Sequence, residues 1–440
     1  MVSGTKGCPF NSGQAHNMDI LIRGGRVVDP EREREETLDI KISKGKVIKV
    51  AKSLRPKRGE KVIEAKGLIV SPGFIDMHCH FREPGREDEE TLITGSQAAV
   101  SGGFTTVCLM PNTNPPLDNK LAVEYIYSRA NKIGLCNLLP IGTITKGRKG
   151  EELSEMADLA KAGVVGFSDD GDTVTDSNLF RRALEYAKIF KRPIIDHPED
   201  KKLSKEGVMN EGYLSTTLGL SGIPKEAEEI VVFRDLLLSR LTGSRLHLAH
   251  LSTEGSVELV REAKKKGVKV SCEATIHHLI LTEEAIKEYG TNAKVNPPLR
   301  KRKDIEALKR GLIDGTIDAL VTDHAPHSSE EKETDMESAS FGIIGLETLL
   351  PLSLSLVSKE LPLPKILSKF TSNPAKILGL KGRGVIREGN IADITIFDPR
   401  KTWKVKAENL KSKSKNSPFL NWQMKGKVLF TLYAGKIVYP

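Results

Sequence analysis

The sequence lacks any apolar run long enough to span a membrane, and cysteine is scarce. Its hydrophobic stretches all fall short of the roughly 20 residues that a transmembrane helix needs. The five cysteines lack the spacing of a disulfide framework or a CxxC motif: Cys8, Cys79, Cys108, Cys136 and Cys272. We therefore expect no membrane association and a reducing, cytoplasmic location.

Aromatic residues are also few, at 5% of the chain, although the formal net charge is +9. Proteins that bind nucleic acids usually gather basic residues on one surface, often interleaved with aromatic ones. Here the basic residues are mixed with acidic ones along amphipathic segments such as residues 260–266. We expect no nucleic-acid partner, while the positive field can help to attract an anionic substrate.

The chain of 440 residues is long enough for one large core and a small accessory domain. Residues 1–17 show no apolar pattern, and we set them aside as a disordered leader or a vector-derived remnant. Residues 18–70 and 384–440 both show short alternating strands separated by glycine turns. Because neither end has enough strands to close a core alone, we predict a small β-sandwich domain formed by both chain termini.

Between these ends, residues 71–383 alternate apolar strands with amphipathic helices. We place strands near residues 69–80, 105–112, 136–144, 164–170, 193–197, 245–250, 268–277 and 319–323. Eight strands that alternate with helices indicate parallel βα units closed into an α/β fold of the (β/α)8 TIM-like type. A doubly wound open sheet is the alternative architecture.

The first predicted barrel strand ends in a His-x-His pair, His78 and His80. Residues two apart on a strand project from the same face, so both imidazoles can reach one metal ion. Such a pair alone is a weak signal, but the active sites of these barrels lie at the carboxyl ends of the strands. Cys79, between the two histidines, is expected to point away from them.

Nine of the ten histidines lie at the ends of predicted strands, and aspartates accompany them. They are His78, His80, Asp169, Asp170, Asp196, His197, His247, His250, His277, His278, Asp323, His324 and His327. Histidines without a shared role would be scattered over helices and loops. Imidazole and carboxylate ligands suit Zn²⁺, with Mn²⁺, Co²⁺ or Ni²⁺ as alternatives, and such a metal lowers the pKa of bound water to about 7. The pattern therefore predicts a metal-dependent hydrolase barrel.

Eight motifs resemble, in order, those of the dihydroorotases in the amidohydrolase superfamily: HCHFREPG, MPNT, GFSDDG, DHPED, HLAHLST, NPPLR, TDHAPH and FGIIGLET. The resemblance covers essentially the whole chain from Met18 to Pro440. It implies the reversible cyclisation of N-carbamoyl-L-aspartate to L-dihydroorotate plus water in de novo pyrimidine (UMP) biosynthesis, by a metal-activated hydroxide. It also implies one or two Zn²⁺ per chain, a homo-oligomer and, as in some relatives, a complex with aspartate transcarbamoylase.

By this resemblance, His78, His80 and Asp323 bind the first metal, and His197 and His250 hold a second one. The resemblance also gives Asp323 a second role as the proton shuttle, which takes the proton of the attacking hydroxide and delivers it to the departing ring nitrogen.

The place between the two metals departs from many relatives, which carry a carboxylated lysine there. Residues 164–175 contain no lysine, so the chain resembles the subgroup that uses an aspartate. Asp170 is the favoured residue, and Asp169 is the competing candidate. Because an aspartate bridge is shorter, the number of bound metals stays open between one and two.

The substrate carboxylate needs a cationic clamp. Arg82 offers a planar fork that suits a carboxylate, and the resemblance adds Asn112 and His327 to this clamp. Asn296 is similar to a family residue that contacts the pyrimidine ring. His247 is expected to pack within its strand rather than bind metal.

Two alternative functions remain. A dihydropyrimidinase, hydantoinase or allantoinase shares the barrel and the metal ligands, but its substrates lack the ring carboxylate that Arg82 would bind. A catalytically silent scaffold for aspartate transcarbamoylase would typically have lost metal ligands, and this chain retains them.

Overall fold

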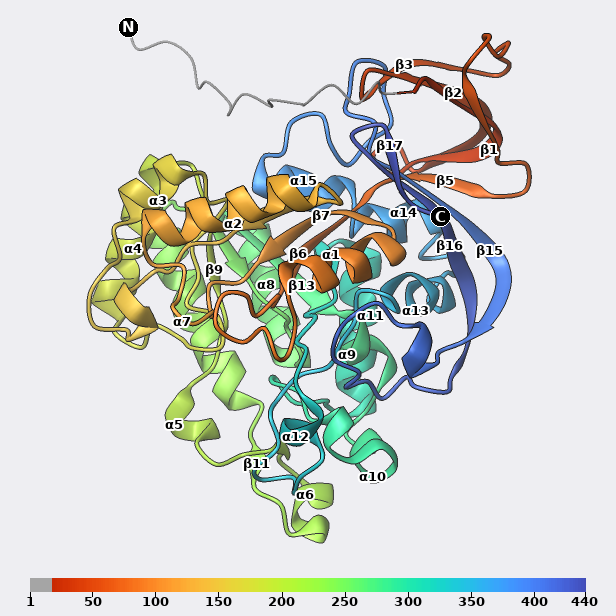
Figure 1. Ribbon diagram of the computed structural model, residues 1–440. Helices are drawn as coiled ribbons and strands as arrows, with labels where there is room; N and C mark the ends of the chain where they lie inside the picture. The colour runs from red at the N-terminus through yellow and green to blue at the C-terminus, as the bar shows by residue number, and fades with distance from the viewer. Residues whose placement is uncertain (1–17) are drawn as a thin grey trace, which may run out of the picture.

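The computed structural model describes residues 18–440, so the leader predicted at residues 1–17 lies outside the described part. Figure 1 shows two units, a barrel surrounded by helices and a sheet at one side that contains strands from both ends of the chain. The predicted barrel with a terminal β-sandwich is confirmed by this arrangement and by the solved structures reported below.

The terminal domain is an eight-stranded sheet in the order β17-β16-β15-β5-β1-β2-β3, with β4 paired to β1. Its strands are β1 (Ile20–Asp29), β2 (Arg34–Ser43), β3 (Lys46–Ala51), β4 (Lys61–Glu64), β5 (Ile69–Pro72), β15 (Ile394–Lys404), β16 (Gln423–Tyr433) and β17 (Lys436–Tyr439). The two chain ends meet where β5 pairs antiparallel with β15, with Val70 opposite Ile396. Both side chains belong to a core that is separate from the barrel core, so neither terminal segment is complete without the other.

The barrel strands run parallel in two groups, β6-β7-β8 and β14-β13-β12-β9. Their bounds are β6 (Phe74–Cys79), β7 (Phe104–Leu109), β8 (Asn137–Pro140), β9 (Ile194–Asp196), β12 (Leu246–Leu248), β13 (Val270–Thr275) and β14 (Ala319–Val321). Parallel bridges from Phe167 to Gly142 and to Ile194 insert the fourth predicted strand between β8 and β9. A parallel bridge between Cys79 and His324 joins β6 to the segment after β14. The ring is therefore closed, and the open-sheet alternative was wrong.

Helices cover the outside of the ring, as Figure 1 shows. The longer ones are α1 (Leu92–Ser101), α2 (Lys120–Ile133), α3 (Met156–Ala162), α4 (Ser177–Ile189), α7 (Glu226–Thr242), α8 (Glu254–Lys265), α11 (Arg302–Asp314), α13 (Leu349–Ser355) and α15 (Ser372–Leu378). Helix α8 shows why they form here. The Thr253 side chain caps its first turn, and Val257 and Val260 turn toward the barrel.

Short elements lie in the loops at the carboxyl ends of the strands or between helices. They are η1 (Lys146–Arg148), α5 (Lys201–Ser204), β10 (Met209–Asn210), α6 (Tyr213–Leu218), β11 (Gly222–Ile223), α9 (Ile276–Ile280), α10 (Ala285–Tyr289), η2 (Gly290–Ala293), α12 (Ser329–Lys332), α14 (Leu363–Ser368) and η3 (Ala407–Asn409). Several of them follow the strands that carry the histidine motifs, which is where such barrels place their functional loops.

The prediction of one strand over residues 69–80 was wrong, because β5 belongs to the terminal sheet and β6 to the barrel. Gly73 separates them. A Cβ atom at this position would lie 2.2 Å from Thr105 Oγ1, so only glycine allows the chain to pass this close to β7. The seventh predicted strand is shorter than expected, and His277 and His278 lie in α9 instead of at its end.

The domain limits at residues 70/71 and 383/384 stay predictions. Within the predicted C-terminal part of the β-sandwich, β15 ends at Lys404 and β16 begins at Gln423. The intervening residues 405–422 leave the sheet, and Lys413 N–H donates to Glu90, which lies between β6 and α1 of the barrel. This part of the chain therefore contacts the barrel as well as the terminal domain.

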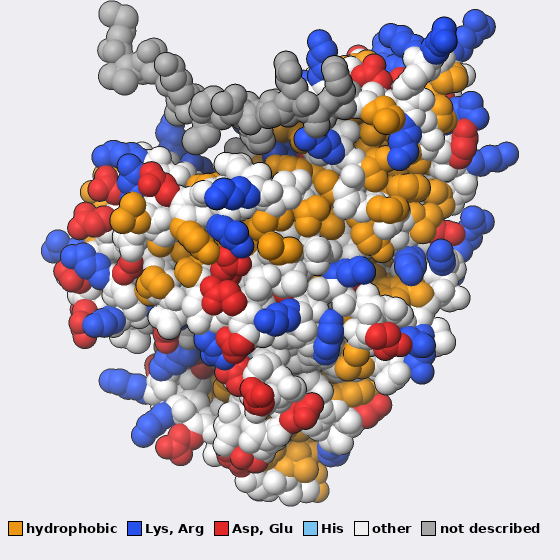
Figure 2. Space-filling model, viewed as in Figure 1, with side chains coloured by type: hydrophobic (Ala, Val, Ile, Leu, Met, Phe, Trp, Pro, Cys, Tyr) orange, Lys and Arg blue, Asp and Glu red, His pale blue; other side chains and the backbone are white. Residues whose placement is uncertain are grey.

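On the face shown in Figure 2, Lys and Arg side chains are scattered among acidic, polar and apolar ones. Among residues 18–440, no helix has the length and apolar character needed to cross a bilayer.

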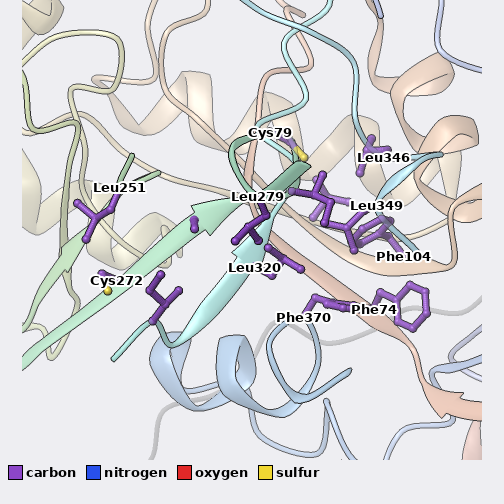
Figure 3. Close-up of a cluster of buried hydrophobic side chains, with 14 of the residues drawn as sticks. Phe74, Cys79, Phe104, Leu251, Cys272, Leu279, Leu320, Leu346, Leu349 and Phe370 are labelled. Carbon is purple, nitrogen blue, oxygen red and sulfur yellow. The ribbon is translucent and has the colours of Figure 1, made fainter. Parts of the chain in front are cut away.

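Aromatic side chains pack together where the first barrel strand begins. Figure 3 shows Phe74 of β6 and Phe370, which precedes α15, next to each other in the buried cluster. Their ring centroids are 4.9 Å apart in an edge-to-face arrangement. Phe370 also accepts a backbone hydrogen bond from Ile75 N–H at 2.8 Å, so it holds the first barrel strand in place.

We expect Phe370→Ala to lower the free energy of unfolding by about 3–5 kcal/mol, because the change removes a fully buried ring and leaves a cavity. Denaturant unfolding followed by circular dichroism measures this effect. Leu121→Ala is the matched control, since Leu121 is 76% exposed, and its effect should stay within about 0.5 kcal/mol. Equal unfolding midpoints for the two variants would contradict the packing role of Phe370.

Candidate metal-dependent active site

A cavity of about 510 Å³ opens at the carboxyl ends of the barrel strands. Apart from the fully buried His78, all of the site residues predicted from the sequence line it. They are His80, Arg82, Asn112, Asp170, His197, His250, Asn296, Asp323 and His327. The structure therefore brings together residues that are up to about 250 positions apart in the chain.

Strand ends place the four innermost side chains. His78 lies within β6 and His80 directly after it, Asp170 follows the fourth strand, and Asp323 follows β14. Asp323 has a positive φ of 46°. An L-residue rarely adopts this conformation, and such local strain is concentrated at functional sites. His250 and Arg82, with φ values of 29° and 58°, share this feature.

The separations of these four side chains match those of ligands around one metal ion. Asp170 Oδ1 lies 3.3 Å from His78 Nε2, and Asp170 Oδ2 lies 3.6 Å from His80 Nε2. Asp323 Oδ1 lies 3.5 Å from His78 Nε2 and 3.1 Å from His80 Nε2. In a tetrahedral zinc site with bonds of about 2.0–2.1 Å, neighbouring ligand atoms are about 3.3–3.4 Å apart. The donor set thus has the spacing that a tetrahedral metal requires.

The same group of side chains contains unpartnered polar atoms. Among the described residues, His78 Nε2, Asp170 Oδ1 and His250 Nδ1 are buried without a hydrogen-bond partner. Buried polar atoms rarely lack a partner unless an ion or a water molecule belongs there. His78, His80 and Asp323 form one group with metal-ligand spacing, and His78, Asp170 and His250 form another.

The protonation states of the two aspartates and of His80 also suit a cation. Burial disfavours the charged form of Asp323, but His78 and His80 outweigh it and hold the pKa of Asp323 far below its usual value. The pKa of Asp170 is likewise lowered, because the histidines around it outweigh burial. Both carboxylates are therefore ionised at neutral pH, as metal ligation requires. Burial lowers the pKa of His80, so its ring is available as a neutral ligand.

The two histidines predicted for a second metal contact each other directly. His197 Nδ1 and His250 Nε2 are 2.8 Å apart and share a hydrogen bond. This is shorter than the separation of about 3.3 Å expected for two nitrogens on one tetrahedral ion. Asp170 Oδ1 lies 3.8 Å from His197 and 3.7 Å from His250. The second group therefore lies next to the first, but its two histidines are too close together to hold a tetrahedral ion unless they move apart.

A buried carboxylate orients the first ligand. Glu273 on β13 lies with Oε1 2.7 Å from His78 Nδ1, which directs Nε2 toward the two aspartates. Its other oxygen lies 3.0 Å from His247 Nε2. Burial opposes its ionisation, but these two imidazoles lower the pKa of Glu273 to about 2. A carboxylate behind a metal-binding histidine fixes the ring and raises its basicity as a ligand.

Amide and carboxylate partners hold other rings in the same way. Asn112 Oδ1 lies 2.8 Å from His80 Nδ1, so this asparagine contacts a predicted metal ligand as well as the cavity. Glu199 Oε2 lies 2.9 Å from His197 Nε2 and accepts a hydrogen bond from Asn296 Nδ2 at 3.0 Å. The predicted ring-binding residue and the second-metal ligand thus share one carboxylate.

The structure brings together Arg82 and His327, which were predicted to form the carboxylate clamp, with a partner that the sequence reasoning missed. Arg82 Nη2 and His327 Nε2 are 3.1 Å apart at the cavity. Glu89 bridges them from behind, with its oxygens 3.0 Å from Arg82 Nε and 2.8 Å from His327 Nδ1. His327 Nε2 lies 2.8 Å from the Phe341 carbonyl oxygen. The ring of His327 is thus held between Glu89 and the Phe341 carbonyl group.

Other candidates from the sequence lie away from the centre. His247 packs within its strand between Ser271 and Glu273, as expected. Cys79 Sγ points away, at 3.1 Å from Asp76 Oδ2. Asp169, the competing candidate for the bridging position, accepts hydrogen bonds from the backbone of Ile144 and Thr145 instead.

Sequence reasoning missed Glu89, Glu199 and Glu273. A signal existed for two of them. Glu273 is the one acidic residue of the predicted strand at residues 268–277, and Glu199 lies two residues after His197. Nothing in the local sequence distinguishes Glu89 from the other acidic residues of the Arg86–Glu90 segment.

Family models match both parts of the chain. Residues 67–256 match "Dihydro-orotase-like", and residues 341–439 match "Amidohydrolase family". Among curated proteins, the chain is 52% identical over 423 residues to a dihydroorotase of Geobacter sp. (strain M21), which covers 96% of this chain and 99% of that protein. It is 51% identical over 424 residues to a dihydroorotase of Endomicrobium trichonymphae, with 96% and 100% covered.

Solved structures with the same architecture include cyclic-amide hydrolases. The L-hydantoinase (dihydropyrimidinase) from Arthrobacter aurescens superposes with a TM-score of 0.85 at 26% identity, covering 96% of each chain. A D-hydantoinase superposes with a TM-score of 0.83 at 24% identity, covering 96% of this chain and 95% of that one. At this level of identity, the second likeness concerns the fold.

We expect Glu273→Gln to weaken metal binding roughly 10- to 100-fold, because His78 loses the carboxylate that orients it. Competition between the protein and a chelator for Zn²⁺ measures this without any assay of activity. Glu347→Gln is the control, since Glu347 is a buried carboxylate that binds Ser101 and Lys411 instead. Wild-type metal affinity in Glu273→Gln would contradict the orienting role.

Proposed function

The chain belongs to the dihydroorotase family of the amidohydrolases, and on this basis we propose that its barrel cavity carries out the dihydroorotase reaction. This reaction is the reversible ring closure of N-carbamoyl-L-aspartate to L-dihydroorotate and water. The observation that carries the assignment to this cavity is the juxtaposition of two sites. A four-ligand metal site and a cationic clamp for a carboxylate, Arg82 with His327, line the same space.

The cation would be held by His78, His80, Asp170 and Asp323, since each carboxylate has oxygens 3.1–3.6 Å from the Nε2 atoms of both imidazoles. Zn²⁺ is the ion that we propose, because mixed imidazole and carboxylate ligands in this geometry suit it. When bound, such a metal polarises the carbonyl under attack and lowers the pKa of water.

A second ion would lie between Asp170, His197 and His250. The hydrogen bond between the two histidines must open for it to bind. We therefore propose that the first position is occupied preferentially and that the second has lower affinity. One and two ions per chain both stay compatible with catalysis in this scheme.

Asp323 is proposed to move the proton. In the hydrolytic direction, its carboxylate accepts the proton of the attacking water and delivers it to the ring nitrogen, because an amide anion is too poor a leaving group. His80 Nε2, 3.1 Å from Asp323 Oδ1, holds this carboxylate in place. In the biosynthetic direction, the same carboxylate takes the proton from the carbamoyl nitrogen as the ring closes.

Arg82 and His327 are proposed to bind the carboxylate that dihydroorotate carries on its ring. Glu89 occupies the Nε edge of Arg82, which leaves the two terminal nitrogens for a bidentate contact. Asn112 completes this clamp next to His80. Asn296, held by Glu199, is proposed to contact the pyrimidine ring.

The alternative substrates fit these features less well. Dihydrouracil and simple hydantoins lack the ring carboxylate, so the partly buried Arg82 and His327 would face no anion in their complexes. The hydantoinase likeness is at 26% identity, whereas the dihydroorotases are about 50% identical over nearly the full length. A silent scaffold would not need the ligands that the cavity retains.

The cysteines and one exposed apolar surface bear on the cellular location and on partners other than the substrate. We propose the cytoplasm, supported by the four described cysteines, which are all free and buried. A homo-oligomer and an aspartate transcarbamoylase complex stay predictions. The outer face of α7 offers apolar surface for either, since Phe233 and Leu241 are 53% and 63% exposed.

We expect Arg82→Met to lower kcat/KM for dihydroorotate roughly ten- to hundredfold, because a charged hydrogen-bonded contact to the carboxylate is lost. Turnover of dihydrouracil, measured side by side, should not fall. Arg181→Met is the control, because Arg181 pairs with Glu185 on the surface of α4. A wild-type preference for dihydrouracil would refute the proposed substrate.

We expect Asp170→Ala to lower the metal content per chain and to reduce dihydroorotate hydrolysis by more than roughly a hundredfold, because one ligand of both metal positions is lost. Elemental analysis of the purified variants gives the occupancy. Asp172→Ala is the control from the same loop, since its side chain pairs with Arg148 and is half exposed. Unchanged occupancy and rate in Asp170→Ala would show that the bridging assignment is wrong.

A further inference from the structure

The segment between β15 and β16, residues 405–422, reaches the rim of the active-site cavity. In Figure 1 it connects the two long blue strands on the side of the barrel. Its backbone is tied to two carboxylates of the barrel. Lys411 N–H donates to Glu347 Oε2 at 2.9 Å, and Lys413 N–H donates to Glu90 Oε1 at 3.1 Å. Ser414 Oγ donates to the carbonyl oxygen of Glu89 at 2.6 Å.

Asn416 is the residue of this segment that comes nearest to the clamp, and it is 5% exposed. Its Oδ1 accepts the backbone N–H of His327 at 3.1 Å. Its Nδ2 donates to the carbonyl oxygens of Ala325 and Gly342, both at 3.0 Å. Its own carbonyl oxygen accepts from Ile344 N–H at 3.0 Å. One side chain therefore joins two separate loops.

These two loops are the ones that set the position of the His327 ring. The first carries His327 itself. The second carries Phe341, whose carbonyl oxygen lies 2.8 Å from His327 Nε2. Lys332 Nζ supports the second loop by donating to the carbonyl oxygens of Ser340 and Gly342, at 2.7 and 3.1 Å. If the link through Asn416 is lost, the backbone of His327 can shift relative to the Phe341 carbonyl group that its ring contacts.

We propose that Asn416 is a positioning residue for substrate binding, which acts through His327 to hold the carboxylate clamp in its binding geometry. This inference rests on the proposed dihydroorotase function of the cavity. Asn416 touches no atom of the metal ligands, so its effect should fall on substrate affinity and not on the chemical step. A displacement of about 1 Å at a binding group is enough to change the rate of a substrate that depends on it.

The amide is the side chain that this position requires. An asparagine presents one acceptor to the His327 N–H and two donors to the carbonyl groups of Ala325 and Gly342. An aspartate has the same shape, but it would place a negative charge against two carbonyl oxygens and could donate to neither. Asn416→Asp and Asn416→Ala therefore both break the link, the first without removing volume.

The test measures steady-state hydrolysis of dihydroorotate by the full-length, metal-loaded protein. We expect the KM of Asn416→Ala and Asn416→Asp to rise roughly tenfold, with kcat within about twofold of wild type. The control is Asn373→Ala. Asn373 Nδ2 also donates to a backbone carbonyl, that of Asp318, but this residue does not line the cavity. Its KM should match the wild-type value.

A double-mutant cycle separates positioning from a general loss of structure. If Asn416 acts through His327, then adding Asn416→Ala to His327→Ala should cause no further loss of kcat/KM. If the losses of the two single variants multiply in the double variant, this inference is overturned. It is also overturned if both Asn416 variants are active and have the wild-type KM. Neither result would contradict the proposed function. An absence of dihydroorotate hydrolysis by the wild-type chain would instead refute the proposed function and, with it, this role of Asn416.

Discussion

Two carboxylates buried among four imidazoles are the constraint on which the rest of the structure depends. Asp170 lies within 3.8 Å of a nitrogen of each ring, those of His78, His80, His197 and His250. Such charges are costly to remove from water unless a counter-charge compensates them. A cation bound here would compensate His78 Nε2 and Asp170 Oδ1, which lack a hydrogen-bond partner. The barrel is the rigid frame that holds these groups together, although removing them from water is costly.

A second layer of side chains makes the inner layer specific. Glu273 beside His78, Glu199 beside His197 and Glu89 beside His327 each bind one ring nitrogen of the histidine. Each contact selects which nitrogen carries a proton and prevents the ring from turning. In this way, these carboxylates decide how the histidines at the site are oriented toward the substrate. The same arrangement serves the metal site and the carboxylate clamp.

The terminal domain is connected to this chemistry through the backbone. Gly73 lets the chain pass from the terminal sheet directly into β6, the strand that carries His78. At the other end of the chain, residues 405–422 return from the same sheet to the loops around the cavity, with Asn416 at the point of contact. The domain that both termini build thus borders the barrel at the start of its first strand and at the rim of its cavity.

Sequence alone determined the barrel, the terminal sheet, and the placement of the histidines and aspartates at strand ends. These are local properties, since a period of two residues on a strand decides which side chains share a face. The absence of lysine near Asp170 likewise follows from the sequence directly. The tertiary structure alone decided the break at Gly73, the contact between His197 and His250, and the partners Glu89 and Glu273. Each of these depends on the distance between atoms that are far apart in the chain, which only the packing of the closed barrel defines.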